Sequence, residues 1–140
     1  DAICPVAGQY SFGKWQLDRF SFAQLADPAV SGEDADGEGD GIDNYGEYLQ
    51  NGNPTAGNDR PLAFVRNGNQ LTLIFHRPKG AVEAPSLESS TTLLLGSWGG
   101  IPGWEAASTI TDLGNYERIT YGATINPVAD KRRFWRVVFE

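Results

Sequence analysis

The chain is poor in the residues that build most catalytic and metal sites. Its 140 residues include one histidine, one cysteine and no methionine. The single histidine, His76, excludes every metal site or proton relay that needs two imidazoles. Cys4 leaves three possibilities open: a small buried residue, a free thiol, or a bridge to another chain or to a missing part of the parent protein. Because the sequence starts at Asp1, we expect either a processed mature protein or a piece of a longer one.

Long apolar runs and basic stripes are also missing. No run approaches the length of a membrane span, and the first residues show no signal-peptide pattern. With 11 basic and 18 acidic residues, the net charge is −7. Proteins that bind nucleic acid present basic surfaces, often with aromatic platforms. We therefore expect no membrane span and no nucleic-acid partner.

The acidic residues are concentrated in one stretch. Eight of them fall between residues 27 and 47, where the sequence has no lysine or arginine. Carboxylates this close repel one another unless a cation lies among them. A disordered acidic linker is the alternative interpretation. A linker, however, has no reason to keep Gly41, Asn44 and Glu47 in the register of a metal-binding loop.

The spacing of these residues is that of a calcium-binding loop. Residues 36–47, DGEGDGIDNYGE, follow the spacing D-x-[DE]-x-D-G-x5-E. Acidic side chains stand at positions 1, 3 and 5, with the short Asp at positions 1 and 5, and Gly41 at position 6 allows a sharp turn. Position 7 gives a backbone carbonyl, position 9 acts through a water, and the glutamate at position 12 binds with both oxygens. The sequence therefore predicts a Ca²⁺ site made by Asp36, Glu38, Asp40, Ile42, Asn44 and Glu47.

The two parts of the chain differ in hydrophobic period. Residues 1–60 read as a helical calcium-loop segment, with apolar residues at helical spacing on both sides of the loop. Residues 61–140 read as about seven short strands separated by Gly, Pro, Asn and Asp. Asn67-Gly68 is a strong hairpin signal. We predict a mainly β fold, in which a small antiparallel β-sandwich follows a short helix–calcium loop–helix segment and packs with it as one unit. The expected strands cover residues 62–66, 71–76, 81–88, 89–95, 104–110, 118–125 and 134–139.

Several short motifs together resemble a known family. They are Trp15-x4-Phe20, Asp27-Pro28, Ser31-Gly32, Asn44-x2-Glu47-Tyr48-x3-Gly52-x-Pro54, Glu88-x-Ser90-x2-Leu93-x4-Trp98 and Arg133-Phe134-Trp135-Arg136-Val137. The chain resembles the C-terminal accessory module of many large secreted bacterial proteins, including polysaccharide-degrading enzymes. In that family a calcium loop like those of thrombospondin type 3 or dockerin repeats precedes a small β-sandwich.

The resemblance implies secretion to the extracellular space and an accessory role. An extracellular location also suits the loop, since a weak-to-moderate calcium site stays filled where calcium is near millimolar. The chain departs from the family in two places: Glu38 replaces the usual Asp at position 3, and Thr92 stands where an Asp is common before Leu93. Because the incoming helix does not run directly into position 1, we expect a static structural site and not a sensor that opens on binding.

The sequence offers no convincing active site. No G-x-S-x-G context accompanies the lone His76, which we expect to be an exposed residue on a strand, opposite the apolar face. A carboxylate pair for glycoside hydrolysis would need a cleft, and a sandwich of some eighty residues leaves little room for one. The candidate acids for such a pair are Glu83, Glu88, Glu105, Asp112 and Glu117. We predict that the chain is not an enzyme.

Aromatic residues suggest two non-catalytic functions. Trp98 and Trp104 flank a glycine-rich turn, and rings held on loops suit stacking on sugar faces, although either ring could instead pack in the core. The first hypothesis is a carbohydrate-binding or substrate-targeting module whose polysaccharide contacts Trp104, Trp98, Tyr116 and Tyr121. The second is a structural or assembly domain, such as a surface anchor, an adhesin or a subunit of an extracellular polymer, that associates with itself or with domains of its parent chain. Residues 134–139, apolar on both faces, fit a central strand or a partner surface.

Overall fold

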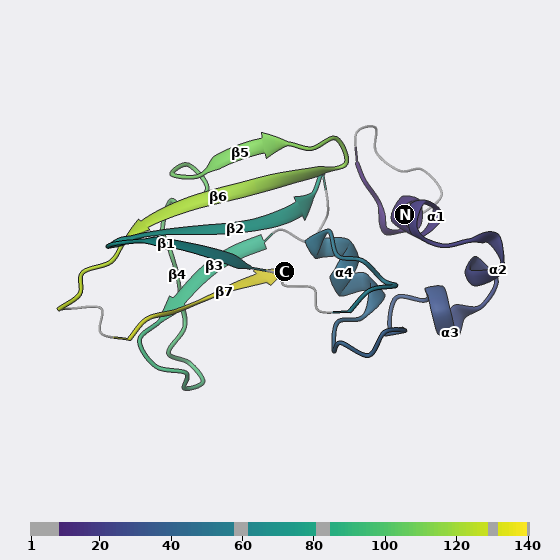
Figure 1. The fold of residues 1–140 in the computed structure, drawn as a ribbon, viewed down its shortest axis with the longest axis horizontal. Coiled ribbons are helices and arrows are strands. Elements are labelled where there is room, and N and C mark those ends of the chain that lie inside the picture. The colour runs from purple at the N-terminus through teal and green to yellow at the C-terminus, as the bar shows by residue number, and fades with distance from the viewer. Residues whose placement is uncertain (1–8, 58–61, 81–84, 129–131, 140) are drawn as a thin grey trace.

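The computed structural model describes residues 9–57, 62–80, 85–128 and 132–139. Helices occupy the N-terminal part and strands the remainder, and the two groups lie at opposite ends of the molecule (Figure 1). The helices are α1 (Phe12–Arg19), α2 (Phe22–Leu25), α3 (Pro28–Ser31) and α4 (Asn44–Gln50). The strands are β1 (Ala63–Asn67), β2 (Gln70–Pro78), β3 (Pro85–Ser90), β4 (Gly99–Gly100), β5 (Thr109–Asp112), β6 (Tyr116–Thr124) and β7 (Phe134–Phe139).

Each short helix begins at a side chain that caps it. Ser11 and Ser21 accept hydrogen bonds from backbone amides in the first turns of α1 and α2. Asp27 caps α3, and Asp43 caps α4 by accepting a bond from the Gly46 amide. Such caps satisfy amides that have no partner inside the helix and contribute about 1 kcal/mol each. Because helices of four to eight residues are not stable alone, their burial in the tertiary structure must supply the rest.

The strands form two antiparallel sheets, as the sequence predicted. One sheet has four strands in the order β1-β2-β6-β5, and the other has three in the order β4-β3-β7. The hairpin at Asn67-Gly68 is confirmed, since Asn67 pairs with Gln70 and Gly68 adopts a φ of 61°, which favours glycine. Among the described residues, no helix combines the length and the apolarity of a membrane span.

The strands expected over residues 89–95 and 104–110 are wrong over most of their length, since β3 ends at Ser90 and β5 begins only at Thr109. Residues 91–98 form turns after β3, and residues 102–108 form turns before β5. Strand β3 ends where the Ser90 hydroxyl binds the backbone of Thr92, accepting from its amide at 3.1 Å. The Thr92 hydroxyl in turn accepts a bond from the Leu94 amide at 3.3 Å, a local turn bond. Side chain to backbone bonds thus outcompete the apolar run that predicted a strand.

The core of the sandwich lies between the two sheets. Leu71, Leu73 and Phe75 alternate along β2 and are 6 %, 0 % and 1 % exposed. They pack against Ile119 of β6 and Leu87 of β3. The alternation of apolar and other residues that predicted β2 therefore also identified which face of the strand is buried.

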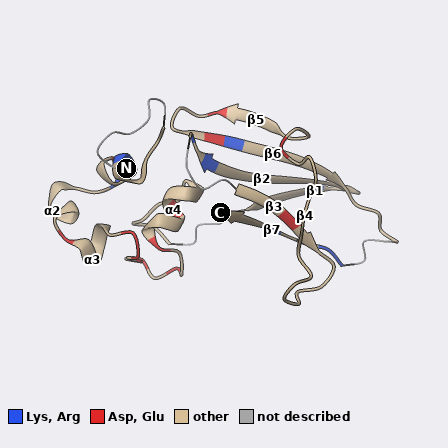
Figure 2. Cartoon of the chain, turned by 180° about the vertical axis from the view of Figure 1, so that it is seen from behind, with Lys and Arg blue, Asp and Glu red and all other residues tan. Residues whose placement is uncertain are grey.

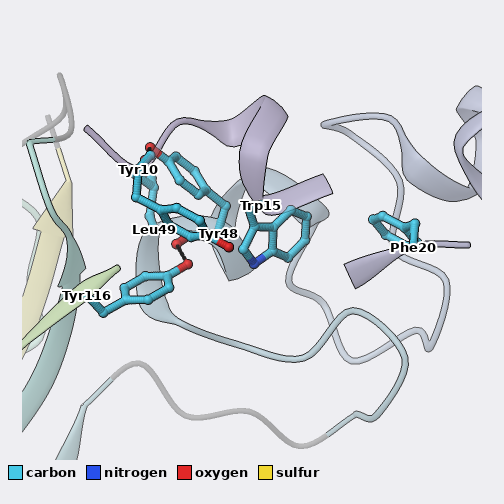
Figure 3. Close-up of a cluster of buried hydrophobic side chains, with 6 residues drawn as sticks. All are labelled: Tyr10, Trp15, Phe20, Tyr48, Leu49 and Tyr116. Carbon is cyan, nitrogen blue, oxygen red and sulfur yellow. Dashed lines mark hydrogen bonds between the residues drawn. The ribbon is translucent and has the colours of Figure 1, made fainter. Parts of the chain in front are cut away.

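A second core joins the helices to the sandwich. It contains Tyr10, Trp15, Phe20, Tyr48, Leu49 and Tyr116, with Trp15 fully buried (Figure 3). The Tyr116 hydroxyl, on β6, donates to the carbonyl of Tyr48 in α4 at 2.5 Å. The Tyr48 hydroxyl donates to the Tyr10 carbonyl at 2.6 Å, and the Tyr10 hydroxyl donates to Asp18 at 2.7 Å. Burial raises the pKa values of Tyr10 and Tyr116, so both stay protonated donors.

We predict that Tyr116→Phe destabilises the chain. The substitution keeps the buried ring but leaves the Tyr48 carbonyl without this donor, which should lower the free energy of unfolding by about 1 kcal/mol. Tyr121→Phe is the matched control, because Tyr121 is only partly buried on the same strand. Urea denaturation of both variants measures the difference. Equal stabilities for the two variants would contradict the role assigned to the Tyr116 hydroxyl.

Candidate functional site

The acidic loop between α3 and α4 is closed by backbone bonds across its base. The amide of Asn44 donates to the carbonyl of Ala35 at 2.9 Å, and the amide of Tyr45 donates to the carbonyl of Glu33 at 3.0 Å. Inside the loop, the two oxygens of Asp36 accept bonds from the amides of Gly39 and Gly41 at 2.8 and 3.0 Å. The loop therefore turns sharply around its first carboxylate.

Two glycines allow that turn. Gly41 has a φ of 92° and Gly39 has a φ of 71°, both in the region that side chains disfavour. The sequence identified Gly41 from its position in the loop but did not single out Gly39. Asp40 accepts a bond from the Ile42 amide at 2.9 Å, which fixes the next residue of the turn.

Three carboxylates converge in this loop. One oxygen from each of Asp36, Glu38 and Asp40 lies within 4.8 Å of the others. Two oxygens bound to the same Ca²⁺ at its usual ligand distances are at most about 5 Å apart. The three residues can therefore hold a metal ion.

The burial of two of these carboxylates, Glu38 and Asp40, makes a cation a good fit. Both carboxylate oxygens of Glu38 and the Oδ2 atom of Asp40 are buried and have no hydrogen-bond partner among the described residues. The segment that follows α4 covers them: a carbon attached to Gly57 would lie 3.4 Å from Asp40 Cβ and 3.6 Å from Glu38 Cγ. A buried carboxylate is costly unless it is paired or binds a metal. This cover was not foreseen, because Gly57 lies ten residues beyond the loop motif.

The remaining predicted ligands lie at and before the start of α4. Glu47 is fully buried, but the group of three convergent carboxylates does not include it. Asn44 is 1 % exposed, and its amide nitrogen donates to the carbonyls of Val30 and Gly32 at 2.9 and 2.8 Å. These two bonds tie α4 to α3. Ile42 lies in the turn before α4. Of the six predicted ligands, the three that the structure brings together are Asp36, Glu38 and Asp40.

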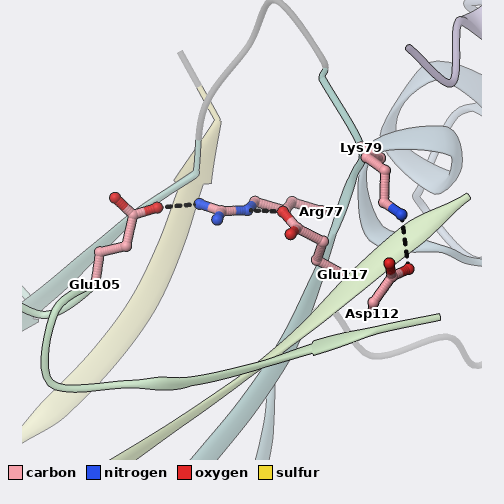
Figure 4. Close-up of polar contacts among 5 residues, drawn as sticks. All are labelled: Arg77, Lys79, Glu105, Asp112 and Glu117. Carbon is pink, nitrogen blue, oxygen red and sulfur yellow. Dashed lines mark hydrogen bonds and ion pairs between the residues drawn. The ribbon is translucent and has the colours of Figure 1, made fainter. Parts of the chain in front are cut away.

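The acids considered for a hydrolytic pair form ion pairs with basic side chains. Arg77 contacts Glu105 and also Glu117, the latter at 3.0 Å, while Lys79 contacts Asp112 at 2.6 Å (Figure 4). Burial lowers the pKa of Arg77, but hydrogen bonds and the charges of the two glutamates outweigh it and raise that pKa overall. Elsewhere on the sandwich, Arg136 pairs with Glu88 at 2.7 Å. Glu83 lies outside the described residues.

His76 is more buried than the sequence suggested. It lies on β2 with intermediate exposure, and burial together with the nearby charge of Arg118 lowers its pKa. Both effects disfavour the imidazolium form in the folded state. The expected exposure is therefore wrong: His76 is half-buried, and Arg118 is its cross-strand partner on β6.

A groove is lined by residues at the starts of β2 and β7, among others. Both strands begin at the end of the sandwich that lies away from the helices (Figure 1). The volume of the groove is about 330 Å³ and most of its walls are apolar. We call it the distal groove; it is lined by Phe64, Arg66, Leu71, Leu93, Trp98, Ile125, Arg133, Phe134 and Trp135. A smaller hollow of about 180 Å³ adjoins it, shares Ile125, Arg133 and Trp135, and adds Tyr121.

The predicted ligand-binding aromatics separate into two pairs. Trp98 lines the distal groove and Tyr121 lines the adjoining hollow. Trp104 instead packs on Phe75 of the core, with ring centroids 5.6 Å apart. Tyr116 is 5 % exposed, belongs to the aromatic core and lines a separate hollow with Tyr10 and Asp18, so its expected contact with a ligand stays a prediction. Alternation along β6 could not show that α4 would cover this ring.

Other residues of the distal groove were missed as a site. Phe64 and Arg66 come from β1, Arg133 comes just before β7, and Phe134 is the first residue of β7. The apolar character of both faces of residues 134–139 was a signal that this strand meets something besides the core. No protein-family model, curated protein or solved structure matches the chain. The resemblance to secreted accessory modules therefore stays a prediction.

We predict that His76 makes folding sensitive to mild acid. Because its pKa is lower in the folded chain than the unfolded value of about 6.5, the unfolded chain binds more protons between those two values. The free energy of unfolding should therefore fall as the pH drops through that window, and His76→Gln should remove this component. Denaturant unfolding of both proteins between about pH 5 and pH 8 tests it. Parallel stability profiles would contradict the prediction.

Proposed function

We propose that this chain is a non-catalytic, calcium-stabilised accessory module of a secreted protein and that it binds polysaccharide in the distal groove. Support for the ion comes from the three convergent carboxylates of the acidic loop, two of which have buried oxygens without a hydrogen-bond partner among the described residues. Support for the ligand comes from aromatic rings that line a groove open to solvent at the other end of the molecule. The convergence of Asp36, Glu38 and Asp40 is the observation that carries the calcium part of the proposal.

The donor set favours calcium over other common ions. The group contains only carboxylates, with no histidine or cysteine, whereas zinc sites are usually built from nitrogen and sulfur ligands. Magnesium demands near-ideal octahedral geometry, while calcium accepts six to eight oxygens in flexible arrangements. Glu38 at position 3, longer than the usual Asp, suits this flexibility. We expect a dissociation constant between about 10⁻⁶ and 10⁻⁴ M.

Calcium should stabilise the wild-type chain and a control variant, but not a variant of the site. At about a hundredfold excess over its dissociation constant, an ion bound only by the folded state adds about 2.7 kcal/mol, or roughly 5–10 °C in Tm. Glu38→Gln should lose most of this shift, whereas Glu33→Gln should retain it, because Glu33 is exposed and lies outside the group of three. Thermal unfolding with calcium and with a chelator measures both. Equal shifts in the two variants would overturn the assignment.

The distal groove has the surfaces that sugar rings need. Phe64, Trp98 and Trp135 line it, and aromatic faces pack well against the apolar faces of sugars. Arg136 stacks over one face of Trp98, with its guanidinium carbon 4.4 Å from the ring centroid, and also pairs with Glu88. The Trp98 ring is thereby held in place and offers a ligand its opposite face. A volume of about 330 Å³ is at the lower end of the usual range for small-ligand sites.

Glycan binding should depend on Phe64 and not on its neighbour Val65. Both side chains are 56 % exposed, but only Phe64 lines the distal groove. In titrations of a glycan panel followed by tryptophan fluorescence, Phe64→Ala should weaken binding roughly tenfold, as expected for loss of one aromatic anchor. Val65→Ala should leave it unchanged. Absence of binding across the panel, or equal losses in both variants, would contradict the proposed binding function.

One observation favours the second candidate, a structural or assembly domain. Leu93, Leu94 and Leu95 project from the turns after β3 and are 67 %, 71 % and 102 % exposed. Neighbouring exposed apolar side chains often mark protein interaction sites. If no glycan binds and light scattering shows association that grows with concentration, this alternative replaces the first. A chain that stays monomeric at high concentration counts against it.

A further inference from the structure

The distal groove combines aromatic rings with positive charge. Among the described residues that line it, the only charged ones are Arg66 and Arg133. The acidic residues of the described chain are numerous around the loop between α3 and α4, at the opposite end of the molecule (Figure 2). A chain with a net charge of −7 therefore presents a locally cationic groove. Charge of this sign close to an apolar wall attracts anionic ligands and repels cationic ones.

Arg66 differs from Arg77 and Arg136 in how it is held. Arg77 and Arg136 are each paired with glutamates. Arg66 instead donates from Nε to the carbonyl of Gly68 at 3.0 Å and forms no ion pair within the described part of the chain. A guanidinium carries five N–H donors, so that single bond orients Arg66 and leaves further donors for a ligand. Arg133 donates to the Ser89 hydroxyl at 3.2 Å, which places it beside β3.

We propose that the polysaccharide bound in the distal groove is an acidic one, whose sugars carry carboxylates. This inference rests on the proposed binding function and narrows its ligand class. The planar fork of arginine matches a carboxylate with two parallel hydrogen bonds, and such bonds are stronger than neutral ones. Phe64, Trp98 and Trp135 would stack on the sugar rings while Arg66 and Arg133 bind their carboxylates. A uronic acid presents both surfaces, a ring face and a carboxylate, on every unit.

The experiment compares two ligands that differ only in charge. Short galacturonic acid oligomers and the same oligomers with carboxylates reduced to alcohols are titrated into the protein by calorimetry. Free calcium is held constant and low, and the oligomers are kept short, because calcium bridges long polyuronates. The acidic oligomer should bind about tenfold more tightly, as one or two charge-assisted hydrogen bonds supply. Its affinity should fall as sodium chloride rises, since salt screens exposed charges.

Three variants locate the binding to the groove. Arg66→Gln and Arg133→Gln should each weaken binding of the acidic oligomer about tenfold and leave binding of the neutral oligomer unchanged. Arg132→Gln is the matched control, because Arg132 is exposed and adjacent to Arg133 but does not line the distal groove. It should change the affinity for the acidic oligomer by less than about twofold. Equal losses in all three variants would show non-specific charge attraction and overturn the assignment to the groove.

The remaining outcomes separate this inference from the function it rests on. Equal binding of acidic and reduced oligomers would overturn the inference while the polysaccharide function stands. No binding of either oligomer, together with no binding in the wider glycan panel, would overturn both. Tighter binding of sulfated oligosaccharides would overturn recognition of carboxylates in favour of sulfates. Tighter binding of poly-glutamate would assign the groove to an acidic polypeptide instead.

Discussion

The fold of the N-terminal part depends on how the charge of the carboxylates in one loop is neutralised. Asp36, Glu38 and Asp40 converge, and the segment around Gly57 closes over the last two. Without a counter-charge, this arrangement combines mutual repulsion with loss of hydration, and each of these effects opposes folding. A bound divalent cation removes both costs at once. We therefore propose that the loop becomes ordered when the ion binds.

Helix α4 links this acidic loop to the sandwich, so the state of the loop affects both parts of the molecule. The helix begins directly after the loop and carries Tyr48 and Leu49 into the aromatic core. There Tyr116 of β6 donates to the Tyr48 carbonyl, so one hydrogen bond connects the helical part to the larger sheet. The distal groove lies at the far end of that sheet. In this account the ion acts on the stability of the whole unit, while the groove supplies the recognition.

The local features of the chain could be predicted from the sequence because their causes are local. Loop spacing identified the three convergent acids, the Asn67-Gly68 pair identified a hairpin, and alternation along β2 identified its buried face. Features that depend on contacts between distant residues could not be predicted. The burial of Tyr116 requires α4, and the burial of Glu38 requires the segment at Gly57. The distal groove likewise needs β1, the turns after β3 and the start of β7 to meet, and no single stretch of sequence shows this.

Calorimetric titration of calcium into the metal-free chain tests the central claim most directly. The account predicts saturable binding of one ion per chain, with a dissociation constant between about 10⁻⁶ and 10⁻⁴ M. The double variant Asp36→Asn, Asp40→Asn, which removes two of the three convergent carboxylates, should abolish that binding. No saturable binding at millimolar calcium, or unchanged binding in the double variant, would contradict the account.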